Sequence, residues 1–392
     1  MYGEGNNKYK TLLADNHMNA TEQLKLKKRE LIDKYAIRHN GMALYQMLST
    51  IVPYVGLYYL SVWSLDISYW LTALFIFMLV LIILRVFMMM HDAGHGCLFV
   101  TPLQNRIAGF IMGVMCGVPE YVWSKHHAYH HATNGNWNKY RGPLAVLSST
   151  EFSKLSEKKQ KAYQRNRNIL LAPFGGFLYF IFNPRFTWAM GTIKFIVHVI
   201  RSYVSGPDRS WQGIRDAFET RYWADWKEYG HMAANNVVLI GLVVLACWAL
   251  GTAAFLTVFV ISMSLAGGLG IILFAIQHNF ENSYATGDDD WDYHTAALEG
   301  TSYFDLPRIL HWFTADIGYH HIHHLSARIP NYKLRACHEE YADLFKDVPR
   351  IRLKDVLHSF QYILWDEDSG RLIRVDQFYE KYGHGEPASV TG

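Results

Sequence analysis

Long apolar blocks alternate with polar stretches along the 392 residues of this chain. A helix needs roughly 20 apolar residues to cross about 30 Å of hydrocarbon, and four blocks reach that length. They cover approximately residues 42–63, 69–90, 232–250 and 252–276. Asp66 and Ser68 mark the turn between the first two blocks, and Gly251 separates the last two. The pattern therefore predicts four transmembrane helices in two tight hairpins.

Two further apolar stretches are predicted to stay at the membrane surface. Residues 106–118 are too few to span, so we expect an interfacial or re-entrant segment there. Residues 169–182 contain Pro173 and are followed by Pro184, which predicts a broken interfacial helix. Residues 153–167 carry a dense run of charges that is typical of a solvated helix.

The basic residues predict the orientation of these helices. No Lys or Arg occurs between Arg38 and Arg85, or between Lys227 and Arg308. Both hairpin tips therefore lack positive charge, and the positive-inside rule places the termini and the middle of the chain in the cytoplasm. We expect a multi-pass protein of the cytoplasmic (inner) membrane, in which Arg85 extends toward the interface.

The expected fold class is an all-α integral membrane protein with a cytosolic helical cap. Its segments are a cytosolic amphipathic N-terminal segment (1–41), the first hairpin (42–90), a cytosolic or interfacial cap (91–231), the second hairpin (232–276) and a cytosolic C-terminal region (277–392). Within the first segment, residues 25–34 are rich in Lys and Arg and predict a helix that lies on the bilayer.

Composition agrees with a membrane protein. Hydrophobic residues make up 51% of the chain and charged residues 18%, against about 25% charged in ordinary soluble domains. The formal net charge of +3 is too small to indicate nucleic-acid binding. The four cysteines form no CxxC pair, and we interpret them as reduced thiols in apolar surroundings.

Three clusters of histidines lie beside the apolar blocks. Each cluster places imidazoles at i and i+4, or at i, i+3 and i+4, and such positions share one face of a helix. Together with the histidine that ends the fourth block, they give nine candidate metal ligands: His91, His95, His127, His130, His131, His278, His320, His323 and His324. The predicted topology brings all of them to the cytosolic face of the membrane, as a shared metal site requires.

Nine imidazoles are too many for one metal ion and suit two. A structural zinc ion takes four ligands, and neutral imidazole binds Fe, Zn, Cu and Ni. Two nearby ions with few carboxylates indicate iron that reacts with dioxygen, although spacing alone leaves the metal open. The register is also open, because His126 and His321 duplicate their clusters. Isolated histidines are interpreted as surface or core residues: His17, His39, His198, His311, His338, His358 and His384.

The motifs together resemble the membrane fatty acid desaturases, and more narrowly their bacterial acyl-lipid branch. They are His91-Asp-Ala-Gly-His95, His127-Ala-Tyr-His130-His131, Gln277-His278-Asn-Phe-Glu281 and His320-His-Ile-His323-His324, within roughly residues 70–340. The resemblance implies a non-haem di-iron centre held by the nine histidines, four crossing helices and a cytosolic cap. It also implies O2-dependent insertion of a double bond into an acyl chain, with electrons from an external donor.

The chain departs from some relatives in two respects. Some animal acyl-CoA desaturases have an asparagine four residues before the fourth-span histidine, and Phe274 stands at that position here. No His-Pro-Gly-Gly haem motif occurs in the sequence, so we expect no fused cytochrome b5. The resemblance therefore implies a separate donor protein, which we expect to be a ferredoxin, a flavodoxin or their reductase.

Three carboxylates and four aromatic side chains stand near the motifs. Asp92, Glu281 and Asp316 are candidates to orient ligand imidazoles by hydrogen bonds, although helix-end capping explains Asp92 and Asp316 equally well. The acyl tail has to enter a tunnel lined by apolar groups. Candidates for this lining, each of which ordinary packing also explains, are Trp123, Tyr129, Trp137 and Trp312.

Alternative functions stay open at this point. Hydroxylases, acetylenases and alkene-forming decarboxylases share histidine clusters of this kind, so the motifs do not fix the product. A non-catalytic membrane metal transporter or sensor is the alternative from another class. Transporters usually carry ionisable residues within their spans, and the middles of the first, third and fourth blocks have none. Double-bond position, chain length and acyl carrier (phospholipid, CoA or acyl carrier protein) do not follow from the sequence.

Overall fold

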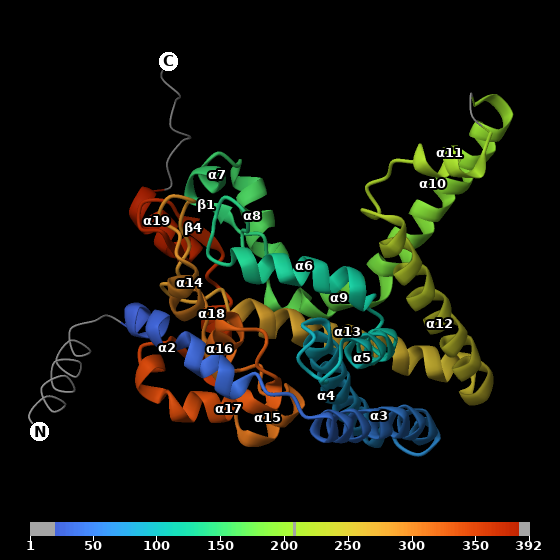
Figure 1. Ribbon diagram of the computed structural model, residues 1–392, viewed down its shortest axis with the longest axis horizontal. Helices are drawn as coiled ribbons and strands as arrows, with labels where there is room; N and C mark the ends of the chain where they lie inside the picture. Colours follow the sequence, from blue (N-terminus) through green and yellow to red (C-terminus); the bar gives the residue numbers. More distant parts are fainter. Residues whose placement is uncertain (1–19, 207–208, 384–392) are drawn as a thin grey trace, which may run out of the picture. The chain divides into compact units, whose positions relative to one another are not determined.

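The computed structural model describes residues 20–206 and 209–383, so His17 and His384 lie outside the described residues. The described part is largely helical and contains five short strands (Figure 1). The chain divides into two compact units. Unit 1 comprises residues 1–39, 128–169 and 272–392, and unit 2 comprises residues 40–127 and 170–271. Helices α6 (Glu120–Thr133) and α13 (Thr252–Ile276) continue from one unit into the other.

Unit 2 is built mainly from long apolar helices. Its elements outside α6 and α13 are α3 (Asn40–Trp63), the 3-10 turn η1 (Ser64–Asp66), α4 (Tyr69–Gly94), α5 (Pro102–Met115), α11 (Trp211–Asp216), α12 (Trp226–Leu250) and the segment from residue 170 to 205. α4 packs against α3 and α5, and α5 also packs against α12. Gly251 connects α12 to α13 with a φ of 86°, which favours glycine because it carries no Cβ. α3, α4, α12 and α13 coincide with the four predicted blocks, except that α4 and α12 are longer.

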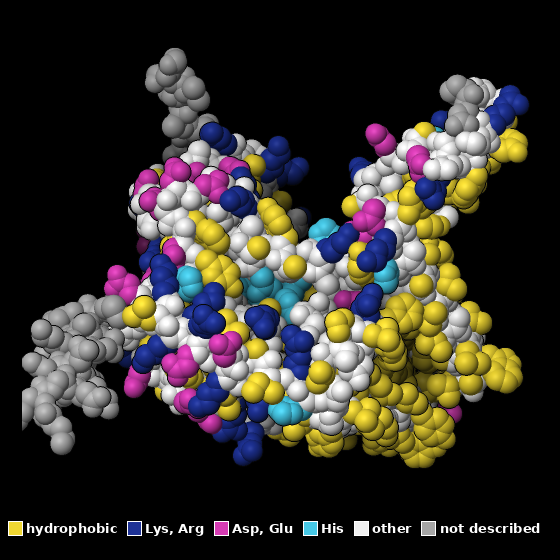
Figure 2. All heavy atoms as spheres, in the orientation of Figure 1, with side chains coloured by type: hydrophobic (Ala, Val, Ile, Leu, Met, Phe, Trp, Pro, Cys, Tyr) yellow, Lys and Arg dark blue, Asp and Glu magenta, His cyan; other side chains and the backbone are white. Residues whose placement is uncertain are grey.

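Large hydrophobic side chains cover the outer faces of α3 and α12 (Figure 2). Val52 on α3 is 67% exposed, and Trp248 on α12 is 83% exposed. Apolar surface of this extent is unfavourable in water, by about 25 cal/mol for each Å². Lipid is therefore the solvent that suits these faces.

Within residues 20–206 and 209–383, five helices are long and apolar enough to cross a membrane, by length and composition, which is one more than the sequence predicted. The additional segment is Ile169–Ser205. It consists of η2 (Ile169–Leu171), α9 (Ala172–Gly176), the π-helix η3 (Phe177–Phe182) and α10 (Asn183–Ser205). Residues 169–182, which were predicted to form a broken helix, instead continue into α10, because a π-helix makes the connection and Pro184 stands in the first turn of α10. Between α5 and α6 the chain bends by 104°, as in a broken span or a re-entrant segment.

The position of Arg85 also differs from the prediction. Its side chain does not extend to the membrane interface but is buried within unit 2, with 1% of its surface exposed. Arg85 Nε donates a hydrogen bond to Thr50 Oγ1 at 3.0 Å, and Thr50 Oγ1 donates to the Gln46 carbonyl oxygen at 2.7 Å. Burial of a cation among apolar helices requires such polar partners.

Unit 1 combines short helices with two small sheets. Its helices are α2 (Ala20–Tyr35), α7 (Ser149–Ser153), α8 (Glu157–Asn166), α14 (Tyr293–Glu299), α15 (Arg308–Phe313), α16 (His320–Leu325), α17 (Asn331–Glu340), η4 (Ala342–Phe345), η5 (Leu353–Asp355), α18 (Val356–Ser359) and α19 (Val375–Tyr382). α8 has no buried residue, which confirms the predicted solvated helix in this region.

The strands of unit 1 were not anticipated by the sequence. β1 (Leu147–Ser148) pairs in parallel with β4 (Leu364–Asp366), which pairs in antiparallel fashion with β5 (Arg371–Ile373). β2 (Tyr303–Asp305) pairs in parallel with β3 (Arg350–Arg352). The expectation of an all-α chain therefore omits two small sheets. Strands of two or three residues are too short for an alternating pattern to appear in the sequence.

α2 is part of the core of unit 1, where it lies against α14 and α17 (Figure 1). Leu24 and Leu31 are completely buried and share one hydrophobic cluster with Ile322 and Leu325 of α16. The apolar face that the sequence assigned to the bilayer therefore packs against protein.

We predict that Leu31→Ala lowers the free energy of unfolding by about 2–5 kcal/mol, because it removes buried methyl groups and leaves a cavity. Thermal unfolding of the purified protein in detergent measures this loss. Leu26→Ala is the matched control, since Leu26 lies on the same helix with 68% of its surface exposed. Equal effects of the two substitutions would show that α2 does not pack as described.

Candidate metal centre

Four histidines of unit 1 converge on one point. They come from α6, from the residues after α13 and from α16, and they are His130, His278, His320 and His324. All four are buried, and each offers a ring nitrogen within 4.8 Å of the others. His278 Nε2 lies 2.9 Å from His320 Nε2. Four imidazoles at this spacing can bind one metal ion, because metal–nitrogen bonds of about 2.0–2.1 Å fit between them.

A second histidine pair lies beside this group in unit 1. The rings of His131 and His323 are 4.5 Å apart, and the ring of His131 stacks on that of His324 at 4.2 Å. His131 follows His130 on α6, and neighbouring residues of a helix point in directions about 100° apart. The two histidines can therefore serve different metal ions.

Unit 2 contains a third histidine group at the end of α4 and on α6. The ring of His91 lies 4.7 Å from that of His95 and 4.8 Å from that of His127, and the last two rings are 5.0 Å apart. His91 Nδ1 lies 3.0 Å from Asp92 Oδ1. A carboxylate in this place fixes the ring orientation and directs the other nitrogen to a metal.

Hydrogen bonds in unit 1 leave ring nitrogens available for a metal. His278 Nδ1 donates to the Gly300 carbonyl oxygen at 3.1 Å, so its Nε2 carries the lone pair. His324 Nε2 is buried and makes no hydrogen bond within the described residues. A buried polar atom without a hydrogen bond is unfavourable, and a metal ion would satisfy it. The residues of this site therefore fit a bound metal.

Burial also keeps these ligands neutral. It lowers the pKa of His278 to about 4, against the opposing effect of the hydrogen bond to Gly300. Burial, followed by the neighbouring imidazoles of which His131 is the largest contributor, holds the pKa of His324 well below its usual range. An imidazole must be neutral to bind a metal ion, so both side chains are in the required form at neutral pH.

Comparison with known proteins supports the same chemistry. A family model described as fatty acid desaturase matches residues 67–353. The chain belongs to the fatty acid desaturase family. A "Fatty acid desaturase" of Bacillus subtilis (strain 168) is 34% identical over 358 residues, which cover 90% of this chain and 92% of that protein. Two proteins named "Omega-6 fatty acid desaturase, chloroplastic", from Arabidopsis thaliana and Brassica napus, are 45% and 43% identical over 51 residues, only 13% of this chain. The resemblance of the histidine motifs to this family is thus confirmed.

The structure of this desaturase-family chain also places the alternative histidines. His126 is exposed, whereas His127 is buried. His321 Nε2 lies 3.1 Å from His338 Nδ1, within hydrogen-bond distance. His126 and His321 therefore lie outside the three groups described above. Other isolated histidines have local partners: His198 Nε2 donates to the Ile214 carbonyl oxygen at 2.9 Å.

The three candidate carboxylates are placed differently. Asp92 contacts His91, as described above. The Asp316 carboxylate lies 3.3 Å from His311 Nδ1, and the side chain of Glu281 is exposed. Of the three, Asp92 lies against one of the nine candidate ligands, His91.

Among the candidate aromatic residues, Trp123 lies beside two histidines of unit 2. Its ring stacks on His127 at 4.4 Å and lies 5.7 Å from His91. Trp137 instead stacks on Trp365 in unit 1, and Tyr129 is 53% exposed. Trp312 is 37% exposed and packs edge-on against its neighbour in the sequence.

Phe274 borders the four-histidine group. Its ring centre lies 5.0 Å from that of His130 and 5.4 Å from that of His278. This position therefore offers an apolar ring to the site. Gly300 was not foreseen as a site residue, because a backbone carbonyl that orients His278 has no signature in the sequence.

We predict that Asp92→Asn weakens metal binding about tenfold or more, because it removes the charge that orients His91. Metal content after dialysis against graded chelator measures the affinity. Asp316→Asn is the matched control: it removes the same charge, beside His311 rather than one of the nine histidines. Equal affinities in the Asp92 variant and the unmodified protein would contradict the prediction.

Proposed function

We propose that this protein is an O2-dependent fatty acyl desaturase with two irons bound by histidines and with electrons from a separate donor protein. The proposal rests on the group of four buried imidazoles within 4.8 Å of one another in a chain of the fatty acid desaturase family. The donor is a ferredoxin, a flavodoxin or their reductase. Family membership indicates a fatty acid desaturase. The proposal adds that the metal is iron, that the oxidant is O2 and that the electrons come from a separate donor protein.

The second iron is assigned to the five remaining histidines. His127 and His131 lie one turn apart on α6, and side chains four residues apart on a helix are neighbours, with about 5–6 Å between their Cβ atoms. His127 belongs to the group with His91 and His95, and His131 contacts His323. The spacing on α6 therefore agrees with the sequence-based proposal that these histidines bind the second iron.

Two irons bound here would supply the oxidant that removes hydrogen from unactivated methylene groups, which side chains cannot provide. One double bond requires the loss of two hydrogen atoms from neighbouring carbons. O2 is reduced to two water molecules by these hydrogens together with two electrons and two protons from outside. The residues of this chain hold the ligands in one orientation, as His278 is held by Gly300, and bury them from water.

The acyl chain is proposed to enter along an aromatic cluster in unit 2. The ring of Phe87 on α4 lies 5.2 Å from Trp123 and 5.4 Å from Phe180 on the π-helix. Trp123 in turn stacks on His127. The cluster thus connects apolar helices with a candidate ligand, and an alkyl tail is the ligand chemistry that such a surface accepts.

Topology is proposed as four crossings by α3, α4, α12 and α13, with both termini and the metal centre in the cytosol. The rings of His130 and His278 are 4.7 Å apart in unit 1, so the chain between them has to cross the membrane an even number of times. α12 and α13 account for two crossings. Ile169–Ser205 is therefore proposed to stay at the surface, although it is long enough to span.

We predict that the purified protein binds about two irons per chain and converts a labelled acyl lipid to an unsaturated product, given O2 and a reduced ferredoxin. His324→Ala should abolish turnover and lower bound iron while membrane insertion persists. His358→Ala is the control, because His358 contacts Tyr362 outside the histidine groups.

The product decides among the alternatives. Mass spectrometry distinguishes an alkene within the acyl chain from a hydroxylated, acetylenic or decarboxylated product. Iron well below two per chain together with unchanged lipid would refute the desaturase proposal. Metal uptake into vesicles with unchanged lipid would support a transporter instead.

A further inference from the structure

A basic hollow lies on the surface of unit 1. Lys and Arg side chains gather over α2 (Figure 2). The hollow is lined by Lys25, Lys28, Arg29, Ile32, Asp33 and Arg328. Four cations thus face one carboxylate, and Arg328 follows the third histidine cluster by four residues. A surface of one dominant charge attracts partners of opposite charge over about 8 Å at physiological salt.

These cations are only partly neutralised by the described residues. Lys25 Nζ forms an ion pair with Asp292 at 2.8 Å. Arg29 lies 3.8 Å from Asp33, but the two side chains are 95% and 71% exposed, so this pair is weak. The hollow therefore keeps a net positive charge that a partner can use.

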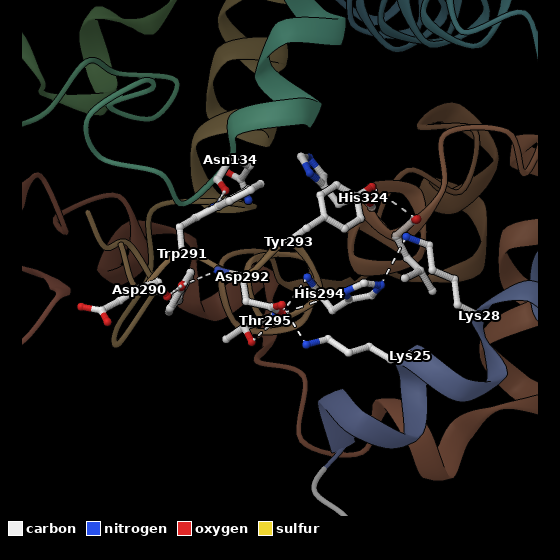
Figure 3. Close-up of polar contacts among 12 residues, drawn as sticks. Lys25, Lys28, Asn134, Asp290, Trp291, Asp292, Tyr293, His294, Thr295 and His324 are labelled. Carbon is white, nitrogen blue, oxygen red and sulfur yellow. Dashed lines mark hydrogen bonds and ion pairs between the residues drawn. The ribbon is translucent and has the colours of Figure 1, made fainter. Parts of the chain in front are cut away.

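Lys28 lines the hollow, and the Tyr293 side chain connects Lys28 to His324, a predicted metal ligand (Figure 3). Lys28 Nζ lies 4.4 Å from the centre of the Tyr293 ring and 3.4 Å from His294 Nε2. The Tyr293 hydroxyl donates a hydrogen bond to the His324 carbonyl oxygen at 2.5 Å. A partner seated in the hollow is thus separated from the backbone of His324 by the Lys28 and Tyr293 side chains.

The hollow is also held in place relative to α16. Leu24 and Leu31 of α2 share a buried cluster with Ile322 and Leu325, which alternate with the histidines of α16. Packed side chains of this kind fix the distance between two helices. The surface and the ligand-bearing helix therefore form one body.

A soluble protein suits this surface better than a lipid bilayer does. An interfacial helix inserts an apolar face below the headgroups, whereas the apolar face of α2 is used by the core of unit 1. On the outer face of α2, Leu26 stands among charged neighbours with 68% of its surface exposed. Charge is thus the dominant feature that α2 offers to a partner.

We infer that this basic hollow is the docking site of the electron donor, and that the donor presents an acidic surface. The inference rests on the proposed function, which requires electrons from outside the chain. Each docking event transfers one electron from a reduced iron–sulfur donor, which is oxidised, to the metal centre, which is reduced. Two events supply the two electrons consumed for each double bond.

The test uses the full-length protein with iron bound, in detergent, and an acidic plant-type [2Fe–2S] ferredoxin as the probe. Arg29→Glu combined with Arg328→Glu reverses two exposed charges of the hollow. We predict that the Kd for ferredoxin, measured by biolayer interferometry, and the KM for ferredoxin both rise about tenfold or more at low salt. The difference should shrink at about 0.5 M salt, and the KM for the acyl substrate should stay unchanged.

Two matched variants make the test specific. Arg29→Lys with Arg328→Lys retains the charges and should retain ferredoxin binding. Lys158→Glu with Lys159→Glu gives the same change in net charge on α8, where both side chains are exposed, and should leave the Kd within about twofold. An equal loss of binding in the α8 variant would overturn the assignment of the docking site.

The remaining outcomes are also decisive. An unchanged ferredoxin Kd in the Arg29/Arg328 reversal overturns the inference, and reduced binding to phosphatidylglycerol vesicles in that variant would then assign the hollow to the membrane. A raised KM for the acyl substrate alone would assign it to the substrate headgroup. Dithionite replaces the donor in a single turnover, so absence of product with dithionite refutes the proposed function, whereas the binding measurement still tests the docking site.

Discussion

Buried imidazoles must remain neutral and correctly oriented, and the described structure around the metal centre serves this requirement. A charged imidazole repels a metal ion, and a neutral one binds only if the nitrogen that faces the metal carries the lone pair. Burial meets the first condition for His278 and His324 by lowering the pKa of each. The Gly300 carbonyl meets the second condition for His278 by accepting the hydrogen of Nδ1. Metal binding would then offset the unfavourable burial of these polar rings.

Helix packing supplies the burial. α16 carries two histidines of the four-histidine group, and its apolar residues Ile322 and Leu325 are buried in the cluster that includes α2. α6 carries His130 and His131, and α13 ends just before His278. Elements far apart in the sequence thus hold a site that none of them could form alone. A loss of packing at α2 should be transmitted to α16, because the two helices share this cluster.

Much of the candidate site follows from the sequence, because it depends on local spacing. The i, i+3 and i+4 positions of a helix share a face whatever the surrounding fold, so His320, His323 and His324 could be grouped from the sequence. Long apolar helices could be located for the same reason. The packing of α2 against protein could not be predicted, because an amphipathic helix has the same sequence pattern whether its apolar face meets lipid or protein. The contact of Asp316 with His311 could not be predicted either, because it depends on the fold, whereas the sequence shows only that Asp316 is close to His320 along the chain.

The two units divide the requirements of the proposed reaction. Unit 2 offers apolar helices and the aromatic cluster of Phe87, Trp123 and Phe180, which suit an acyl chain. Unit 1 offers the four-histidine group and a charged exterior, which suit a metal and a soluble donor. α6 belongs to both units and carries His127 on one side of the division and His131 on the other. Because these residues are one turn apart on one helix, α6 presents a candidate ligand from the histidine group of each unit on the same helix face.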